Sequence, residues 1–350
     1  MSDPRIDEAI AAGHVPPDVP LDVLRESRDT PAIASIVVVA VLTSLVVMCR
    51  LYSRKYITKK YGFGIDDGIA LASLLVFIPF AALCIVLINL GAARNFLFEF
   101  FVMTEDEYRK VQLMDSIAHL AYSTALVLCR VSGIAFYYRI CYLDKKFLLA
   151  IKIIFVIIML GYVAQLCLII FHCQPVNLMW APTSEEEAEK YRCMSWYEIY
   201  TIISSISLVC DFLLFGIPAA MLKGLELPRK QKLQLACTLF PGILVIGISV
   251  ARVVLVTDYA GECQAETDDA FGYAFLKLLC VEVAEVGATI IAVSVPGVKP
   301  MVDKYILTKD KESHSSSSNS RGSSMSSRDE IKPHRGQVHI VELSEEKGGR

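Results

Sequence analysis

The sequence predicts an all-α fold, a multi-pass membrane protein built as a seven-transmembrane-helix bundle with its N-terminus outside and its C-terminus in the cytosol. Of its 350 residues, 54% are hydrophobic and 20% are charged, and the mean hydropathy is +0.49. A chain with this composition is more apolar than a soluble domain of this size. Seven stretches also reach the roughly 20 apolar residues that a helix needs to cross a hydrocarbon core of about 30 Å.

The seven predicted helices divide the chain into three parts. The first helix begins at Pro31, a residue that favours the first helical turn. The predicted spans cover residues 31–51, 68–90, 116–138, 147–171, 199–222, 233–257 and 271–293. We expect residues 1–30 to form a polar extracellular segment and residues 31–300 to form the membrane domain. Residues 301–350 are rich in Ser and have few apolar side chains to bury, which predicts a disordered cytosolic tail.

Lys and Arg residues near the span ends are concentrated on one side of the predicted membrane. Seventeen lie at the ends assigned to the cytosol, against seven at the opposite ends. The positive-inside rule places the richer side in the cytosol. An odd number of spans requires the two termini to lie on opposite sides, and the charges agree with that requirement. We expect this protein in the plasma membrane.

Six ionisable residues stand out within the predicted helices, and one of them, Lys277, lies nearer the outer end than the other five. A charge at membrane depth costs roughly 2.5–3.5 kcal/mol on insertion scales, so such groups normally face the bundle interior and find partners. Arg130 and Asp211 are both close to mid-depth and could pair across helices. Glu282 and Glu285 are three residues apart on one helix face, so a single cation could bridge both. Together with Arg252 they predict a polar membrane core, which either fixes helix register or contacts a ligand and acts as a switch.

Several functional classes are disfavoured by composition and motifs. The net charge of −3 supplies no cationic surface for nucleic acid, so no nucleic-acid partner is expected. The eleven Cys residues show no zinc-ligand spacing, and no metal site is expected. Walker A, H-E-x-x-H and G-x-S-x-G motifs are absent from the sequence. We therefore assign no catalytic residue and no cofactor.

Two cysteines are placed for a disulfide. Cys173 and Cys193 stand at the predicted outer ends of the fourth and fifth spans and bracket the loop between them. An oxidising compartment would permit them to join. The alternative is two free thiols at membrane ends.

The ordered motifs resemble the fungal rhodopsin-domain family, seven-helix receptor-like membrane proteins of filamentous fungi. The resemblance covers residues 47–300. Its elements are Arg50 and Arg54 before Gly64-Ile65-Asp66-Asp67; Arg130-Val131-Ser132 with Phe136-Tyr137-Tyr138-Arg139-Ile140; Cys173-Gln174-Pro175 with Trp180 and Cys193; Asp211 with Pro218; Gly242 with Arg252; and Glu285 with Pro296 and Pro300. The chain looks like the short form of the family, without the Cys-rich extracellular domain that some members carry.

The resemblance implies a receptor-like integral membrane protein that senses an extracellular or membrane-borne ligand and signals through cytosolic loops. The expected partners are membrane lipid, an unidentified small molecule, and a G protein or another cytosolic signalling protein. Asp66, Asp67 and Arg139 are assigned to the cytosolic loops. Arg139 resembles the switch arginine of G-protein-coupled receptors, or is an ordinary positive-inside residue. Retinal is not expected, because Lys277, the one candidate for a Schiff base, lies near the outer end of the last span.

Two other functions stay open at this point. The first is an intramembrane, cyclase-like enzyme that acts on a lipophilic precursor with Asp211, Glu282 or Glu285 as proton donor. The balance of nearby cations argues against it, because those cations would keep the acids ionised. The second is a transporter, which the absence of an internal repeat disfavours.

Overall fold

The computed structural model describes residues 3–17, 19–57, 64–94, 96–140, 145–174, 192–224, 229–265 and 273–302. Within these ranges seven helices are long and apolar enough to cross a membrane, so the predicted seven-helix membrane bundle is confirmed. Residues 303–350, which include nearly all of the expected Ser-rich tail, lie outside the described residues.

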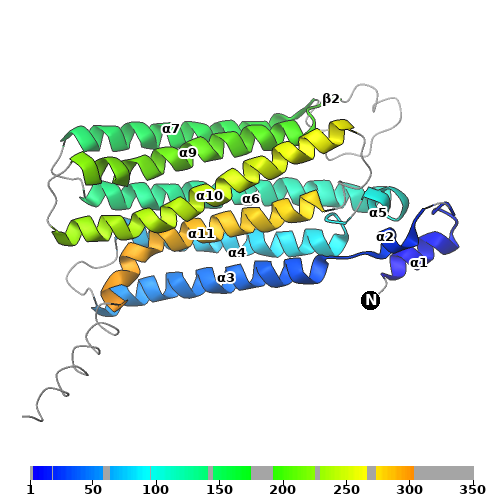
Figure 1. Cartoon of the computed structure of the whole chain (residues 1–350), viewed down its shortest axis with the longest axis horizontal. Coiled ribbons are helices and arrows are strands. Elements are labelled where there is room, and N and C mark those ends of the chain that lie inside the picture. Colours follow the sequence, from blue (N-terminus) through cyan, green and yellow to red (C-terminus); the bar gives the residue numbers. More distant parts are fainter. Residues whose placement is uncertain are drawn as a thin grey trace, which may run out of the picture. The chain divides into compact units, whose positions relative to one another are not determined.

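Each spanning helix packs on the next one along the chain, and the last packs on the first. All seven are labelled in Figure 1. They are α3 (Asp29–Tyr52), α4 (Ile65–Leu90), α6 (Glu105–Ile140), α7 (Lys145–Phe171), α9 (Trp196–Gly224), α10 (Arg229–Ala265) and α11 (Ala274–Val302). A π-helical turn, Ser53–Ile57, extends α3. The other described elements are the short helices α1 (Pro4–Ala11), α2 (Leu21–Arg25) and α5 (Phe96–Phe101), and the strands β1 (Cys173–Gln174) and β2 (Arg192–Cys193).

Helix α6 starts well before the apolar stretch from which the sequence predicted it. It begins at Glu105 instead of Ser116. A reciprocal capping box explains the difference: the Thr104 backbone N–H donates to Glu107 Oε2 at 3.0 Å, and the Glu107 N–H lies 3.4 Å from Thr104 Oγ1. The added turns bring polar residues between Glu105 and Ser116 into the helix.

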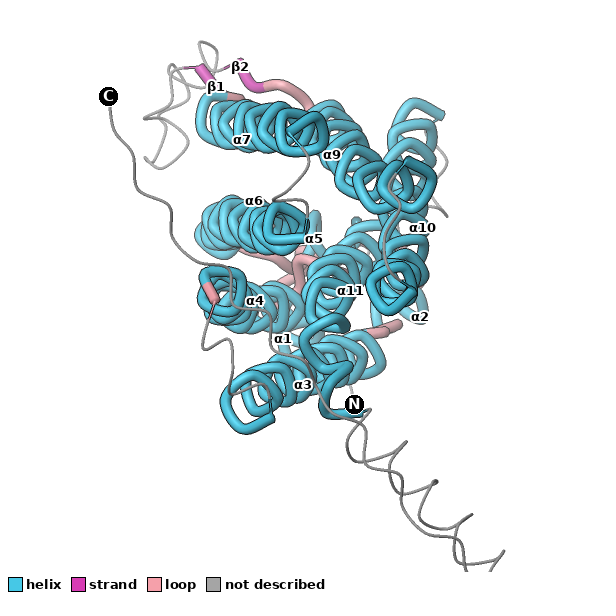
Figure 2. Tube along the Cα trace, turned by 90° about the vertical axis from the view of Figure 1, so that its left-hand side faces the viewer, coloured by secondary structure: helices cyan, strands magenta, loops and turns pink. Residues whose placement is uncertain are grey.

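Helix α11 lies at the centre of the bundle, against α3, α4, α6 and α10 (Figure 2). Its contact with α3 is unusually close because Gly287 has no side chain. A Cβ at that position would lie 2.5 Å from Cγ1 of Val39 and 3.0 Å from Oγ1 of Thr43. By contrast α7 packs mainly on α6 and α9, and it exposes large apolar side chains that suit contact with lipid.

The first thirty residues are not simply a polar extension. Helices α1 and α2 place Ile6 and Leu24 against Phe98 of α5, and all three side chains are buried. These elements lie at the end of the bundle where α4 ends and α6 begins. We name this the capped end, and the other the distal end. Apolar residues spaced among polar ones supply this packing.

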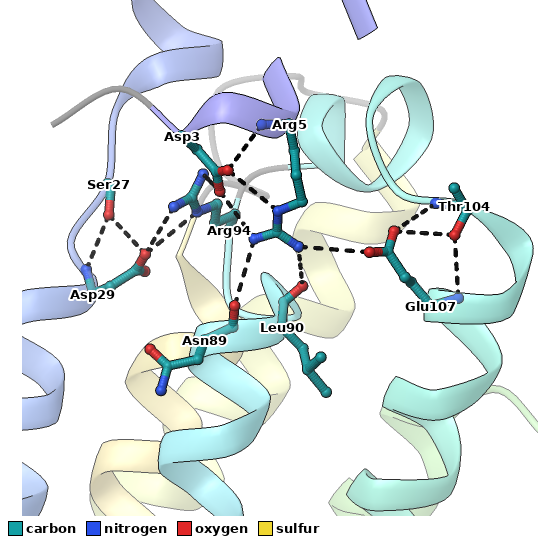
Figure 3. A network of polar contacts seen from close by, with 9 residues as sticks. All are labelled: Asp3, Arg5, Ser27, Asp29, Asn89, Leu90, Arg94, Thr104 and Glu107. Carbon is teal, nitrogen blue, oxygen red and sulfur yellow. Dashed lines mark hydrogen bonds and ion pairs between the residues drawn. The ribbon is translucent and has the colours of Figure 1, made fainter. Parts of the chain in front are cut away.

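We name the short helices α1, α2 and α5 the cap, and charged side chains also connect it to the bundle (Figure 3). Arg94, which follows α4, lies 3.0 Å from Oδ2 of Asp3 and 3.2 Å from Oδ2 of Asp29. Arg5 pairs with the same Asp3 and donates to the backbone oxygen of Leu90 at 3.1 Å. The N-terminal segment is therefore bonded to the end of α4, and Arg94 links both to the start of α3.

Candidate functional site

The structure brings Arg130 and Asp211 together in the bundle interior. Nε of Arg130 on α6 lies 2.9 Å from Oδ1 of Asp211 on α9, and both side chains are buried. Arg130 also donates to the backbone oxygen of Ser207 at 3.1 Å. The Arg130 guanidinium thus contacts both Asp211 and the Ser207 backbone, which are on the same helix, α9.

Glu285 of α11 is the second anchor of the polar core. Its Oε2 accepts a hydrogen bond from the Tyr122 hydroxyl at 2.7 Å. Nη1 of Arg252 lies 3.0 Å from the same oxygen, although the guanidinium hydrogens do not align with it as a hydrogen bond requires. The Arg252 guanidinium also lies over the Tyr122 ring, 5.1 Å from its centroid. We treat the contact as a buried ion pair.

Ser249 of α10 joins these two pairs. Its Oγ lies 2.9 Å from Oδ2 of Asp211 and 2.9 Å from Oε1 of Glu285. A hydroxyl carries only one hydrogen, so Ser249 can donate to one carboxylate at a time. The hydroxyl therefore links Asp211 on α9 to Glu285 on α11.

Glu282 takes a separate partner, which corrects the idea that one cation bridges both glutamates. Its Oε1 lies 3.3 Å from Nε2 of His119 on α6. Nδ1 of His119 faces Asp115, one turn earlier, at 2.9 Å from its backbone oxygen and 3.3 Å from its Oδ1. The Tyr200 hydroxyl of α9 donates to Oδ2 of Asp115 at 2.9 Å.

Sequence reasoning missed His119 and Asp115. The signal was present, because the two residues are four apart and therefore share a helix face. Asp115 was overlooked because it falls one residue before the predicted span, whereas the capping box places it well inside α6. Both side chains are buried.

We use the name polar core for the buried, linked groups of α6, α9, α10 and α11. Its ionisable members are the carboxylates Asp115, Asp211, Glu282 and Glu285, the guanidiniums Arg130 and Arg252, and the imidazole His119. In the part of the chain that the structure describes, no group of three His, Cys, Asp or Glu side chains could hold a metal ion.

Asp66 and Asp67 are not loop residues, which corrects the sequence assignment. They occupy the first turn of α4 and are buried. A helix N-terminus favours carboxylates there, and Oδ2 of Asp67 accepts the Gly64 backbone N–H at 3.2 Å. Arg50 of α3 pairs with both, at 2.9 Å to Asp66 and 2.8 Å to Asp67.

Arg139 also belongs to a helix, the last turn of α6, and not to a loop. Its Nη1 lies 3.8 Å from Oδ1 of Asp66, and 42% of its side chain is exposed. Arg50 also contacts α11, because it donates a hydrogen bond to the backbone oxygen of Val293. We name Arg50, Asp66, Asp67 and Arg139 the distal cluster, which joins α3, α4, α6 and α11.

Cys173 lies in a disulfide. The antiparallel register of β1 and β2 places its backbone opposite that of Cys193. The pairing of Cys173 with Cys193 stays a prediction that this register supports.

A pocket of about 180 Å³ opens at the capped end and reaches the polar core. Asp115 and Tyr200 are at its inner wall. Its lining residues are Ala92, Arg94, Glu99, Met103, Tyr108, Val111, Gln112, Asp115, Tyr197, Tyr200, Leu255, Val256, Ala274, Phe275 and Leu278. We name it the capped-end pocket. It is smaller than the roughly 300–1,000 Å³ typical of drug-sized ligand sites.

A second pocket, of about 60 Å³, lies toward the distal end and touches the other side of the polar core. Its lining includes Asp211, Tyr137, Pro218, Gly242 and Pro296. We name it the distal pocket. The two pockets occupy opposite halves of the same four helices, and the polar core lies between them.

These features define an integral membrane protein with seven helices, a buried charge network and a small pocket at one end. The sequence family agrees with this class: residues 49–304, more than half of the chain, match the fungal rhodopsin domain. The chain therefore belongs to the fungal rhodopsin-domain family, as its motifs predicted. No curated protein and no solved structure matches it.

Proposed function

We propose that this chain is a receptor-like membrane protein in which a ligand at the capped end biases the arrangement of helices at the distal end. One observation carries the proposal: two groups of buried polar contacts share α11. One links Asp115, in the capped-end pocket, through His119 to Glu282, and the other links Glu285 through Ser249 to Asp211, in the distal pocket. Glu282 and Glu285 are one turn apart on the same helix. Ionisable residues inside membrane-spanning helices normally mark functional sites.

The contacts suggest how the bias passes along the bundle. A ligand that engages Asp115 competes with His119 for that carboxylate, and His119 also faces Glu282. Glu282 and Glu285 are on one helix, so a shift of α11 at Glu282 is carried to Glu285. Ser249 then passes the change to Asp211 on α9. A ligand shifts such an equilibrium only by its difference in affinity for the two states.

In this proposal the protein lies in the plasma membrane, with the capped end on the extracellular side and the distal end on the cytosolic side. The excess of Lys and Arg at the distal ends of the helices supports this orientation. The distal cluster then lies where a G protein or another cytosolic protein would bind. Reporter tags at the two termini test the orientation, because the N-terminal tag should label from outside and the C-terminal tag only after permeabilisation.

Coupling between the two ends is testable without a ligand. Spin labels on noncanonical amino acids at positions 138 and 240 report the separation of α6 and α10 at the distal end, since both native side chains are exposed. Tyr200→Phe removes the hydrogen bond to Asp115. We expect it to shift the distance distribution between the labels. Tyr56→Phe, at an exposed tyrosine outside the polar core, is the matched control. Identical distributions in all three proteins would contradict the proposal.

A further inference from the structure

The capped-end pocket has more negative than positive charge available to a ligand. Asp115 and Glu282 share one imidazole, so even a charged His119 neutralises only one of the two carboxylates. Of these acids Asp115 lines the pocket itself, and Glu99 is the second acid of the lining. Burial raises the pKa of the Glu99 carboxyl, as expected where no cation compensates it. The pocket thus retains at least one unbalanced negative charge.

The basic residue of the wall does not offset this charge. Arg94 lines the pocket, but its guanidinium is already paired with Asp3 and Asp29 at 3.0 Å and 3.2 Å. Figure 3 shows these two carboxylates converging on Arg94 at the base of the cap. Arg5 also pairs with Asp3, so two cations meet two anions in this cluster, and Arg94 brings no unpaired positive charge to the wall.

One carboxylate oxygen in the wall lacks a hydrogen-bond donor. Oδ2 of Asp115 accepts from Tyr200, whereas Oδ1 is buried and has no hydrogen-bond partner. Nδ1 of His119 lies 3.3 Å from that oxygen, but it is closer, at 2.9 Å, to the backbone oxygen of Asp115. A buried acceptor without a donor is costly, so the site favours a ligand that brings an N–H.

The remaining walls suit an apolar body with a cationic head. Tyr108, Tyr197 and Phe275 supply aromatic rings, which attract organic cations through their faces. Val111 and Leu278 supply aliphatic surface beside them. The volume of about 180 Å³ limits the ligand to a small molecule.

We propose that the capped-end pocket binds a small organic cation, a protonated amine with an aromatic or aliphatic body, whose charged head group pairs with the Asp115 carboxylate. This inference rests on the receptor-like function proposed above and names the chemical class of its ligand. Glu99 lies on the wall of the same pocket, and a bound cation would favour the charged form of its carboxyl.

Three probes of matched shape test the ligand class on the full chain purified in detergent. They are 2-phenylethylamine, 2-phenylethanol and 3-phenylpropionate, with binding measured by titration calorimetry at neutral pH. We expect the amine to bind at least about tenfold more tightly than the alcohol, the ratio for one hydrogen bond to a charged group, and the carboxylate not to bind. Equal affinity of amine and alcohol, or no binding of the amine, overturns the proposal.

Variants locate the site. Asp115→Asn and Glu99→Gln should each weaken amine binding, Asp115→Asn by at least about tenfold. Glu105→Gln is the control, because Glu105 is on the same helix as Asp115 and 92% of its side chain is exposed. It should leave amine binding unchanged. Glu99→Gln covers the case in which Asp115→Asn does not fold. Undiminished binding to both variants would overturn the assignment. Because the spin-label experiment uses no ligand, a distance shift without amine binding would leave the receptor-like function standing.

Discussion

The Tyr122 hydroxyl donates to Oε2 of Glu285 at 2.7 Å, and this one bond joins the middle of α6 to the middle of α11. Both residues are buried, so neither end of the bond has water as a substitute. The contact also holds the tyrosine ring beneath the Arg252 guanidinium. It is the shortest route by which a change on α6 reaches the glutamate that α9 and α10 share through Ser249.

Tyr122→Phe should lower the free energy of unfolding by about 1.5–3 kcal/mol, the range for a lost hydrogen bond to a charged group. The ring packing is retained, so the loss reports the hydroxyl alone. Thermal unfolding in detergent measures it. Tyr138→Phe, at a side chain that is 41% exposed, is the control and should change little.

Asp211→Asn should destabilise the bundle by about 3–5 kcal/mol, because it leaves the buried Arg130 without its anion. Adding Arg130→Gln should restore part of the loss, since no charge is then stranded. Melting temperature and surface expression of both single variants and the double variant are the measurements. If Asp211→Asn left stability unchanged but abolished formation of a cyclised product, Asp211 would be a catalytic acid.

Arg50 and Arg139 of the distal cluster should differ sharply on substitution. Arg50→Met leaves the two buried aspartates with longer contacts, chiefly those of Arg54 at 3.4 Å and 3.5 Å, and should cost about 3 kcal/mol or more. Arg139→Met removes a half-exposed guanidinium 3.8 Å from Asp66 and should cost less than about 1 kcal/mol. Each variant is compared with the parent by thermal unfolding. Equal losses would mean that Arg139 contributes far more to the distal cluster than its geometry indicates.

The cap should loosen in acid. Burial raises the pKa of the Asp3 carboxyl, but the hydrogen bonds and charge of Arg5, together with the charge of Arg94, outweigh it and hold the pKa below its ordinary value of 3.8. A carboxyl with a lowered pKa stabilises the folded state above its ordinary value, and this contribution is lost as the pH falls through the lowered value. Hydrogen exchange of α1, corrected for the intrinsic effect of pH, should therefore rise below pH 3.8.

The matched variants for the cap are Asp3→Asn and Asp7→Asn. The first should raise exchange at neutral pH and flatten the acid-dependent rise. The second removes an acid that is 55% exposed and pairs only with Arg25 among the described residues, so the rise should remain. An acid response that persists unchanged in Asp3→Asn would assign the effect to other carboxyls.

The partner of Cys173 is expected to be Cys193. Mass spectrometry of non-reduced peptides should recover the two residues in one cross-linked species. Recovery of Cys193 as a free thiol from mature protein is the opposing result. Cys167, an exposed free cysteine of α7, serves as an internal control for complete alkylation.

The spanning helices were predictable because their signal is local: about 20 apolar residues in a row determine a membrane helix wherever it packs. Five of the seven ionisable core residues followed from the same rule, since charges inside such stretches need partners. Which partners they find depends on helix rotation and depth. Those are tertiary properties, and for this reason Glu282 facing His119 could not be derived from spacing alone.

Two boundary effects account for what the sequence did not reveal. The Thr104–Glu107 capping box lengthened α6 and brought Asp115 into the core. The Gly64–Asp67 contact turned an expected loop into the first turn of α4 and placed Asp66 and Asp67 beside Arg50. In each case one or two backbone hydrogen bonds moved a helix end, and the polar residues near that end changed from surface to interior.

The bare backbone at Gly287 determines how closely α11 lies against α3. A larger side chain at this position would meet Val39 and Thr43, so it would force the two helices apart. Gly287 follows Glu285 by only two residues, and Glu285 holds the hydrogen bonds from Tyr122 and Ser249. A substitution at a residue that has no polar side chain would therefore disturb the polar core through helix spacing alone.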